Sequence, residues 1–198
     1  MKILRITSSP RKERSKSMKL GAAIVERLLA VHPDAIVKHK DLTASPFPHL
    51  EEVHLQGFYT PVERRLPGHD EALLHSDEAV AEVIEADVLV IEAPLYNFTI
   101  SSTLKAWIDH IVRNGFTFRH TPDGDVGLLT GKKVYVAVTA GYIYSDNRGK
   151  DKDFVRPLLR AILNMLGITD ITFIMAEGLN VPGVKETALQ KALDSIKI

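Results

Sequence analysis

Seven residues near the middle of the chain, Asp87–Ala93, read DVLVIEA, and they constrain the fold more than any other stretch. Within them, Val88–Ile91 are all aliphatic, so neither side of a strand built from them has a polar residue to face solvent. A strand of this kind is buried on both faces, which is typical of a parallel sheet covered by helices on each side. The chain is therefore expected to contain a parallel α/β sheet.

Other apolar runs alternate with helical patterns along the chain. Alternating strands and helices favour right-handed crossovers and a parallel sheet. Five strands predict a flavodoxin-like, doubly wound α/β fold with strand order 2-1-3-4-5 and helices on both faces, rather than the six-stranded dinucleotide-binding fold. The expected strands are 2–7, 35–40, 87–93, 133–139 and 171–176, and the expected helices are 17–32, 70–86, 102–114, 151–166 and 183–198.

Two irregular segments interrupt this alternation within what we expect to be one domain over residues 1–198. Residues 42–68 contain four prolines without a clear period, and they predict a long loop with at most one helical turn. Loops this long in a compact domain are usually functional or cover an interface, and an ordinary surface loop is the alternative. Residues 115–131 predict a hairpin-like excursion that turns at residues 122–124.

The charge balance and the missing cysteines exclude several classes of function. The 25 basic residues equal the 25 acidic ones, whereas general binders of nucleic acid or membrane surfaces need a basic excess. The absence of cysteine excludes disulfides, thiolate catalysis and cysteine metal sites. Residues 1–10 turn polar too early for a secretory signal, and no apolar run approaches the ~18 residues of a membrane span. We expect a soluble cytoplasmic protein.

The sequence SSPRKERSKS, residues 8–17, joins the first expected strand to the first expected helix. In folds of this kind, the loops at the carboxyl ends of strands 1 and 3 flank the ligand. The unpaired N–H groups of a helix N-terminus suit a phosphate, and serine hydroxyls add further donors. Plain helix capping by Ser15 or Ser17 is the alternative. The glycine-rich fingerprints of dinucleotide and nucleoside triphosphate sites are absent.

The loops after strands 3 and 4 carry groups suited to a planar ligand. Tyr96, Asn97 and Phe98 follow the buried strand, where aromatic rings can stack on a heteroaromatic ligand and an amide can meet its edge. Packing of these rings beneath the next helix is the alternative. Gly141 permits close backbone approach to a ligand, or only a tight turn. Trp107 has the spacing of a core residue.

Histidines and arginines give weaker signals. The eight histidines show no spacing that predicts a metal site. His110 and Arg113 share one expected helix, and we expect them on its solvated face. The sequence leaves open whether Arg119 contacts a ligand or only supports the structure.

Three stretches resemble the FMN-dependent NADH:quinone oxidoreductases, a family also called azoreductases. They are Pro94–Phe98, Gly115–Arg119 and Leu166–Asp170, and the resemblance covers nearly the whole chain. It implies an FMN cofactor with its phosphate on the first loop and its isoalloxazine ring beside the loops after strands 3 and 4. The residues implied to bind it are Ser9, Ser15, Lys16, Ser17, Leu95, Tyr96, Asn97, Phe98, Thr139, Ala140, Gly141 and Tyr142.

Two positions depart from the pattern of that family. Relatives usually carry a second glycine after the equivalent of Gly141, where this chain has Tyr142, which either fills part of the flavin cleft or points outward. His120 stands where relatives often carry a tyrosine over the substrate cavity. Phe98 and His120 are the residues expected at that cavity.

The resemblance further implies a ping-pong reaction. NADH or NADPH would reduce the flavin and leave, and a quinone or azo compound would then take the two electrons, without a protein nucleophile. Family members are homodimers, and segment 42–68 is a candidate cover of the interface. The alternatives are a flavodoxin-like FMN electron carrier, for which a neutral net charge is unusual, and a non-catalytic module that has lost flavin.

Overall fold

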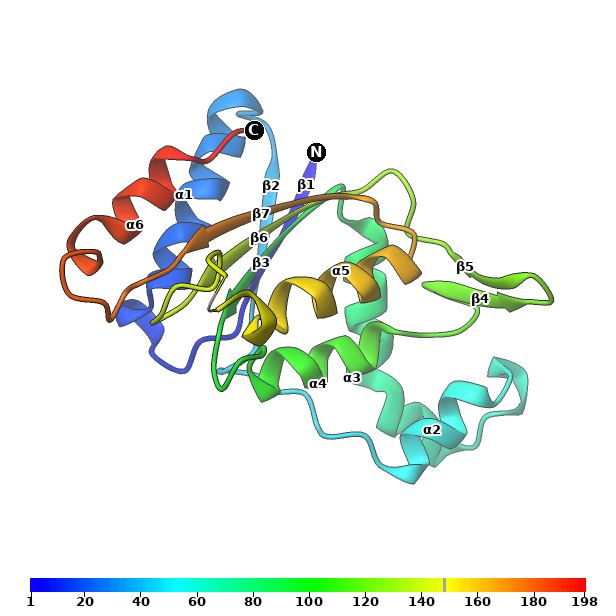
Figure 1. The fold of residues 1–198 in the computed structure, drawn as a ribbon. Helices are drawn as coiled ribbons and strands as arrows, with labels where there is room; N and C mark the ends of the chain where they lie inside the picture. The colour runs from blue at the N-terminus through cyan, green and yellow to red at the C-terminus, as the bar shows by residue number, and fades with distance from the viewer. Residues whose placement is uncertain (148) are drawn as a thin grey trace.

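The computed structural model describes residues 1–147 and 149–198 of the chain. Its centre is a parallel sheet of five strands in the order β2-β1-β3-β6-β7 (Figure 1). Numbered among themselves, these strands have the order 2-1-3-4-5, which confirms the predicted flavodoxin-like topology. The strands are β1 (Lys2–Thr7), β2 (Ile36–Asp41), β3 (Val88–Pro94), β6 (Lys133–Thr139) and β7 (Asp170–Ala176).

Strand β3 lies at the centre of the sheet, as its composition predicts. All of its residues are buried, and it pairs in parallel with β1 on one side and with β6 on the other. Val88 and Val90 face one helical layer, and Leu89 and Ile91 face the other. The one charged residue of β3 is Glu92, whose side chain is fully buried.

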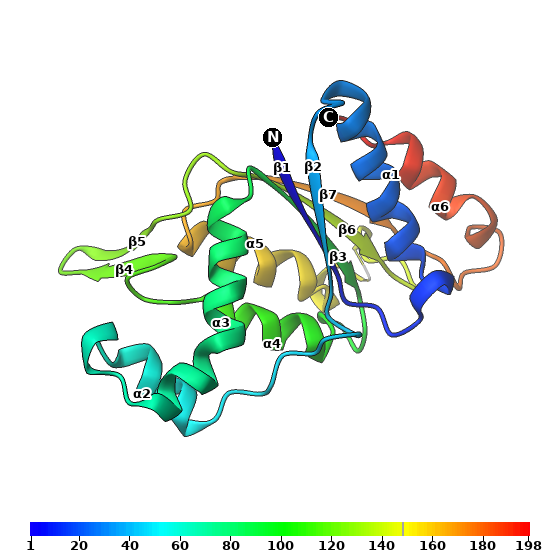
Figure 2. The same ribbon diagram turned by 180° about the vertical axis from the view of Figure 1, so that it is seen from behind.

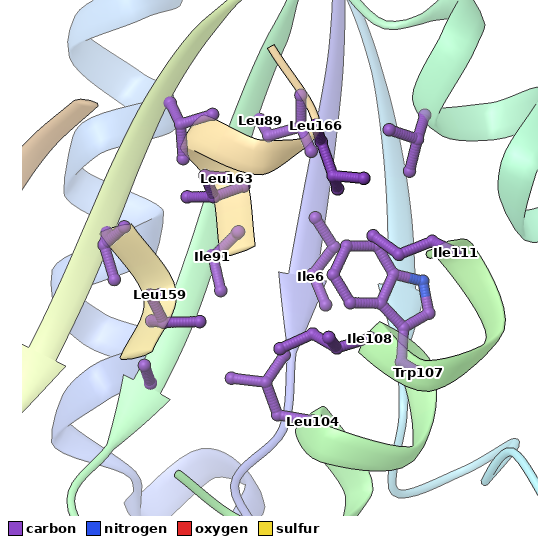
Figure 3. Packing of buried hydrophobic residues seen from close by; sticks show 14 of the residues in the cluster. Ile6, Leu89, Ile91, Leu104, Trp107, Ile108, Ile111, Leu159, Leu163 and Leu166 are labelled. Atoms are coloured by element: carbon purple, nitrogen blue, oxygen red, sulfur yellow. The ribbon is translucent and has the colours of Figure 1, made fainter. Parts of the chain in front are cut away.

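Helices cover both faces of this sheet, as expected (Figures 1 and 2). Trp107 is fully buried in the larger apolar cluster, which confirms its predicted core position, and Figure 3 shows its ring beside Ile6 and Ile111. The layer that contains Trp107 is built by α3 (Pro67–Glu85), α4 (Ser102–Ile111) and α5 (Val155–Met165), and the opposite layer by α1 (Lys16–Val31) and α6 (Lys185–Asp194).

The segment 42–68 differs from the predicted loop, because it contains a helix of two turns, α2 (Glu52–Tyr59), and a short 3-10 turn, η2 (Val62–Arg64). The Glu51 backbone N–H donates to His54 Nδ1 at 3.0 Å, a cap that the usual Ser/Thr/Asp/Asn signals do not reveal. Gly57 lets α2 approach α3 closely, since a Cβ atom there would lie 2.8 Å from Leu73 Cδ1. Helix α2 is therefore packed tightly against α3.

The excursion 115–131 contains the predicted hairpin. Strands β4 (Phe118–Thr121) and β5 (Gly124–Gly127) form a two-stranded antiparallel sheet that projects beyond α5 (Figure 1). Close packing fixes the base of the hairpin, because a Cβ atom on Gly127 would lie 2.0 Å from the backbone nitrogen of Gly167.

The expectation that His110 and Arg113 face solvent is wrong. Both side chains are buried, with exposed fractions of 0% and 1%. His110 Nε2 donates to the Pro48 carbonyl oxygen at 3.0 Å, and the Arg113 guanidinium lies 4.4 Å from the centre of the Phe58 ring. The segment that contains α2 covers this side of α4, so a helix face that looks polar in the sequence becomes interior.

Candidate functional site

Three loops meet at the carboxyl edge of the sheet around a cleft of about 310 Å³. They follow β1, β3 and β6, which are neighbours in the sheet, so the ends of these strands lie side by side. A further contribution comes from the turn after β7. The residues that line the cleft are Arg11, Ser15, Lys16, Pro94, Leu95, Tyr96, Thr139, Ala140, Gly141, Leu179 and Asn180.

The predicted cofactor-binding residues divide between the cleft and its immediate surroundings. Ser9 and Ser17 lie behind the lining: Ser9 Oγ is 3.4 Å from the Tyr96 hydroxyl, and Ser17 Oγ is 2.9 Å from Ser15 Oγ. Asn97, Phe98 and Tyr142 line neighbouring hollows instead, and the other predicted residues line the cleft itself.

Three buried serines, Ser9, Ser15 and Ser17, surround the N-terminus of α1, and together with the first turn of that helix they form the serine cradle. Ser15 caps α1, as the capping alternative allows, because its Oγ accepts a hydrogen bond from the Met18 backbone N–H at 3.4 Å. No acidic side chain lies in the first turn of α1. The partial positive charge of the helix N-terminus is therefore available to an anion.

The loop after β3 makes a strained turn at Asn97 and Phe98. The backbone N–H groups of Tyr96 and Thr99 each donate to the other residue's carbonyl oxygen, at 2.9 and 3.0 Å. The two residues between them have φ angles of 48° and 72°, as a type I′ turn requires. A left-handed backbone costs roughly 1–2 kcal/mol for a residue such as Phe98. Strain of this kind is often retained at ligand sites.

The loop after β6 is held by the turn after β7. The Leu179 and Asn180 backbone N–H groups donate to the carbonyl oxygens of Ala140 and Gly141, at 3.1 and 2.8 Å. Gly141 allows the Asn180 side chain to lie close to this loop, since a Cβ atom at position 141 would lie 2.5 Å from Asn180 Nδ2. Sequence reasoning missed Leu179 and Asn180, since no local motif marks residues that reach a cleft only through sheet topology.

Tyr142 points away from the cleft, with 67% of its surface exposed. It lines an adjacent hollow of about 420 Å³ together with Phe98, Ile143, Lys152 and others. The side chain that replaces the second glycine of the family pattern therefore leaves the main cleft open. Sequence reasoning also missed Lys152, because it comes from η3 (Lys150–Lys152), ten residues further along the chain.

Beneath the serine cradle, the chain buries a charged pair. Glu92 Oε1 accepts a hydrogen bond from Arg5 Nε at 2.7 Å, and Arg5 Nη2 donates to the Met18 carbonyl oxygen of α1 at 2.9 Å. Burial raises the pKa of Glu92 to about 7, against the opposing effect of the Arg5 guanidinium. The signal in the sequence was a lone acidic residue in an otherwise apolar strand.

The remaining candidates lie elsewhere. His120 is exposed on β4, where its ring contacts Asp125 and Phe118, and it lines neither the cleft nor the hollow beside it. Arg119 is exposed on the same strand. Among the described residues, no group of three or more acidic or histidine side chains is arranged to hold a metal ion. In the same residues, no helix is long and apolar enough to span a bilayer.

Comparison with known proteins gives the family. A family profile described as "Flavodoxin-like fold" matches residues 1–197. The chain is 44% identical over 197 residues to an FMN-dependent NADH:quinone oxidoreductase of Herminiimonas arsenicoxydans, covering 98% of this chain and 96% of the relative. It is 44% identical over 182 residues to FMN-dependent NADH:quinone oxidoreductase 2 of Pseudomonas putida, covering 92% of this chain and 90% of the relative.

Solved structures agree. An azoreductase of Bacillus anthracis superposes with a TM-score of 0.91 at 26% identity, covering 98% of this chain and 95% of its own. An FMN-dependent NADH-azoreductase of the same species, in complex with FMN, superposes with a TM-score of 0.87 at 27% identity, covering 98% and 94%. The chain therefore belongs to the flavodoxin-like family that includes the FMN-dependent NADH:quinone oxidoreductases.

Proposed function

We propose that the protein is an FMN-dependent oxidoreductase that uses NADH or NADPH to reduce quinones and azo compounds. The observation that carries this proposal is the convergence of three loops, from β1, β3 and β6, on one cleft in a chain that is 44% identical to named FMN-dependent NADH:quinone oxidoreductases. Azo compounds are included among the proposed acceptors because the similar solved structures are named azoreductases.

The donor groups of the cleft fit FMN. The serine cradle offers hydroxyls and the free N–H groups of a helix N-terminus to one phosphate, and Arg11 and Lys16 bring positive charge to the same wall. Glycine-rich loops let the backbone approach a pyrophosphate closely, whereas a single phosphate does not need this approach. The absence of glycine from residues 8–17 agrees with a monophosphate ligand. FMN would therefore be held through its phosphate by Ser9, Ser15, Lys16 and Ser17.

The other two loops would position the flavin ring. Leu95 and Tyr96 line one side of the cleft, and Thr139, Ala140 and Gly141 line another. The strained Asn97–Phe98 turn places the half-exposed Phe98 side chain in the wall of the adjacent hollow. FMN bound in the cleft would supply the two-electron redox chemistry between the nicotinamide and the acceptor. Residues of this chain bind and orient the reactants.

The hollow beside the cleft would receive the acceptor. Phe98 and Tyr142 give it two exposed aromatic side chains, on which a quinone or an azo-linked ring can stack. Donor and acceptor would use this space in turn, in a ping-pong order. Phe98 is thereby kept as a substrate-cavity residue. His120 would reach a cavity only from another protomer, because it lies on the projecting hairpin of its own chain.

We also propose that the protein acts as a homodimer in the cytoplasm, and that it acts on small molecules rather than nucleic acid or membranes. Exposed apolar side chains gather on α2, η2 and the first half of α3, including Tyr59, Val62, Leu66 and Leu74. Apolar surface of this kind is typical of a protein interface. The neutral net charge supports the small-molecule assignment.

The enzyme proposal is tested by purifying the protein and adding NADH or NADPH to it in the absence of oxygen. We expect a yellow protein whose flavin absorbance is bleached by NADH or NADPH and restored by a quinone, with steady-state velocities that give parallel double-reciprocal plots. A colourless protein that does not take up FMN would contradict the proposal. A yellow protein that neither nicotinamide bleaches would identify an electron carrier instead, and gel filtration with light scattering reports the dimer.

A further inference from the structure

Glu92 is a buried acidic side chain with one oxygen unpaired. It lies near the carboxyl end of β3 and shares the α1 side of the sheet with Val88 and Val90, with an exposed fraction of 0%. Oε1 pairs with Arg5, whereas Oε2 has no hydrogen-bond partner among the described residues. A buried charged oxygen without a partner is costly, so protonation of this carboxyl is favoured.

Helix α1 is adapted to this carboxyl. Gly21 faces Glu92, and a Cβ atom there would lie 2.2 Å from Oε1. Glycine inside a helix is destabilising relative to alanine, so the sequence gives up helix stability to leave room for the acid. Gly21 comes four residues after Ser17, which places the carboxyl about 6 Å along the helix from the level of that serine.

Hydrogen bonds connect the carboxyl to the serine cradle. Arg5 donates to both Glu92 Oε1 and the Met18 carbonyl oxygen, and the Met18 N–H donates to Ser15 Oγ. Ser8, at the start of the loop, donates from its hydroxyl to the Glu92 carbonyl oxygen at 2.7 Å. Residue 92 is therefore joined to both ends of the loop that forms the cradle, through its carboxyl and Arg5 at the helix end and through its backbone carbonyl at the Ser8 end.

Few charged groups surround the acid. Arg5 on β1 contacts it, Asp41 at the end of β2 acts on it from further away, and His39 on β2 lies near Arg5. The register partner on β6 is Ala137, and α1 presents Gly21. A phosphate dianion in the cradle would be a strong additional negative charge at this end of the sheet.

We propose that Glu92 is a proton-binding positioning residue, which takes up a proton when a phosphate monoester dianion occupies the serine cradle. The proposal rests on the assignment of the cradle as the phosphate site of FMN. Its physical basis is that two negative charges separated by a short, poorly solvated path repel, and the carboxyl can remove its own charge. The neutral acid keeps its hydrogen bond with Arg5, so the geometry of the first turn of α1 is retained.

The sign of the pH dependence follows. In the free protein, burial places the pKa of Glu92 at about 7. A bound phosphate is expected to raise the pKa by roughly one unit. The part of the FMN affinity that depends on Glu92 is then greatest below pH 7. This affinity falls by roughly tenfold as the pH rises through the higher pKa of the complex. The phosphate is already mostly a dianion throughout this range, because its second pKa is about 6.

Calorimetric titration of the apoprotein with FMN measures the coupling directly. In two buffers of different ionisation heat at pH 7.5, we expect uptake of about 0.5 proton per FMN, and a dissociation constant that rises about tenfold between pH 6.5 and 9. Riboflavin, which lacks the phosphate, is the ligand control. The Glu92→Gln variant mimics the neutral acid, and we expect it to show no uptake and a flat dissociation constant.

Each outcome decides between the ideas. Equal proton uptake with FMN and riboflavin would overturn the role of Glu92, and so would uptake that survives Glu92→Gln. If that variant does not fold, the comparison of FMN with riboflavin on the wild-type protein still decides. If FMN does not bind, the proposed function fails, and inorganic phosphate then replaces FMN as the probe. Binding of phosphate with proton uptake would still support Glu92, and failure of both ligands would overturn both proposals.

Discussion

Two groups of polar side chains lie in the interior of the protein, and they differ in what covers them. One is the serine cradle, with Ser9, Ser15 and Ser17. The other, the Arg113 cluster, consists of the buried Arg113, His110 and Ser76, with the exposed Asp77 and the half-buried Phe58 beside them. In the Arg113 cluster, Ser76 Oγ donates to the His110 carbonyl oxygen, and Arg113 donates to both Ser76 and Asp77. Residues distant in the sequence cover it.

The serine cradle, although its three side chains are buried, adjoins an open cleft through Ser15. Ser15 Oγ and Ser17 Oγ pair mainly with each other at the edge of an open cleft, and the helix N-terminus beside them has no acidic residue in its first turn. The comparison teaches that burial of polar groups does not by itself mark a ligand site. A site is marked where buried donors meet an open cleft and a backbone strained at Asn97 and Phe98.

The largest effect is expected from removing hydroxyls of the serine cradle. A Ser9→Ala/Ser17→Ala double variant should lose two hydrogen bonds to a charged phosphate, each worth roughly 1.5–3 kcal/mol, so the FMN dissociation constant should rise by about 10² to 10⁴. Fluorescence quenching of FMN by the apoprotein measures it. Ser76→Ala in the Arg113 cluster is the matched control and should leave affinity unchanged. Unchanged affinity in the double variant would mean that these serines serve only the loop.

The opposite pattern is expected for Arg113. Arg113→Ala removes a buried guanidinium that pairs with the exposed Asp77 and packs on the Phe58 ring, so the free energy of unfolding should fall by about 2–3 kcal/mol. Urea denaturation followed by circular dichroism measures this fall. Arg119→Ala, on the exposed side of the hairpin, should change it by less than about 0.5 kcal/mol. If Arg113→Ala lowered the free energy of FMN binding by more than it lowered the free energy of unfolding, the Arg113 cluster would serve the ligand site, which would contradict the comparison.

An intermediate effect is expected where α1 meets Glu92. Gly21→Ala should lower the free energy of unfolding by about 2 kcal/mol, because the new methyl group overlaps the Glu92 carboxyl and the overlap outweighs the gain in helix propensity. Gly68→Ala, on α3, is the matched control: nothing lies within 4 Å of the new methyl group, and stability should rise by about 0.5 kcal/mol. Thermal unfolding measures the stability of both variants. Equal stability changes in Gly21→Ala and Gly68→Ala would contradict the packing explanation.

The smallest effect is expected from pH. Burial lowers the pKa of His110, with a contribution from His54 and against the hydrogen bond to the Pro48 carbonyl. The folded protein therefore binds this proton less readily than the unfolded chain. Stability from this site is complete above the ordinary histidine pKa of about 6.5 and declines as the pH falls through that value towards the lower pKa of the folded state. His110→Phe should flatten the decline in urea denaturation between pH 7 and 5, and an unchanged slope would exclude His110 as its source.

Local patterns predicted much of the fold. The apolar run of β3 required burial on both faces, and the alternation of strands and helices led to the sheet order that the structure has. The same reasoning named Ser15 or Ser17 as the cap of the first helix, of which Ser15 is the one in the structure, and placed Trp107 in the core. These features depend on the periodicity of neighbouring residues, which the sequence displays directly.

The candidate site was predictable only in part. The loops after β1, β3 and β6 were found because sheet topology places the ends of those strands together. Leu179 and Asn180, which line the same cleft, were missed because nothing near them in the sequence indicates a ligand. Tyr142 could not be assigned from the sequence, since its orientation depends on how the following loop is held.

By itself, the sequence determined the sheet, the order of its strands and the edge at which the cleft opens, because hydrophobic periodicity and chain connectivity are properties of the chain alone. Tertiary structure decided which polar residues are buried. His110 and Arg113 became interior only because the segment with α2 packs over α4, and Glu92 became a buried acid because Gly21 of α1 leaves space for it. Burial depends on contacts between residues far apart in the chain, which no local pattern records.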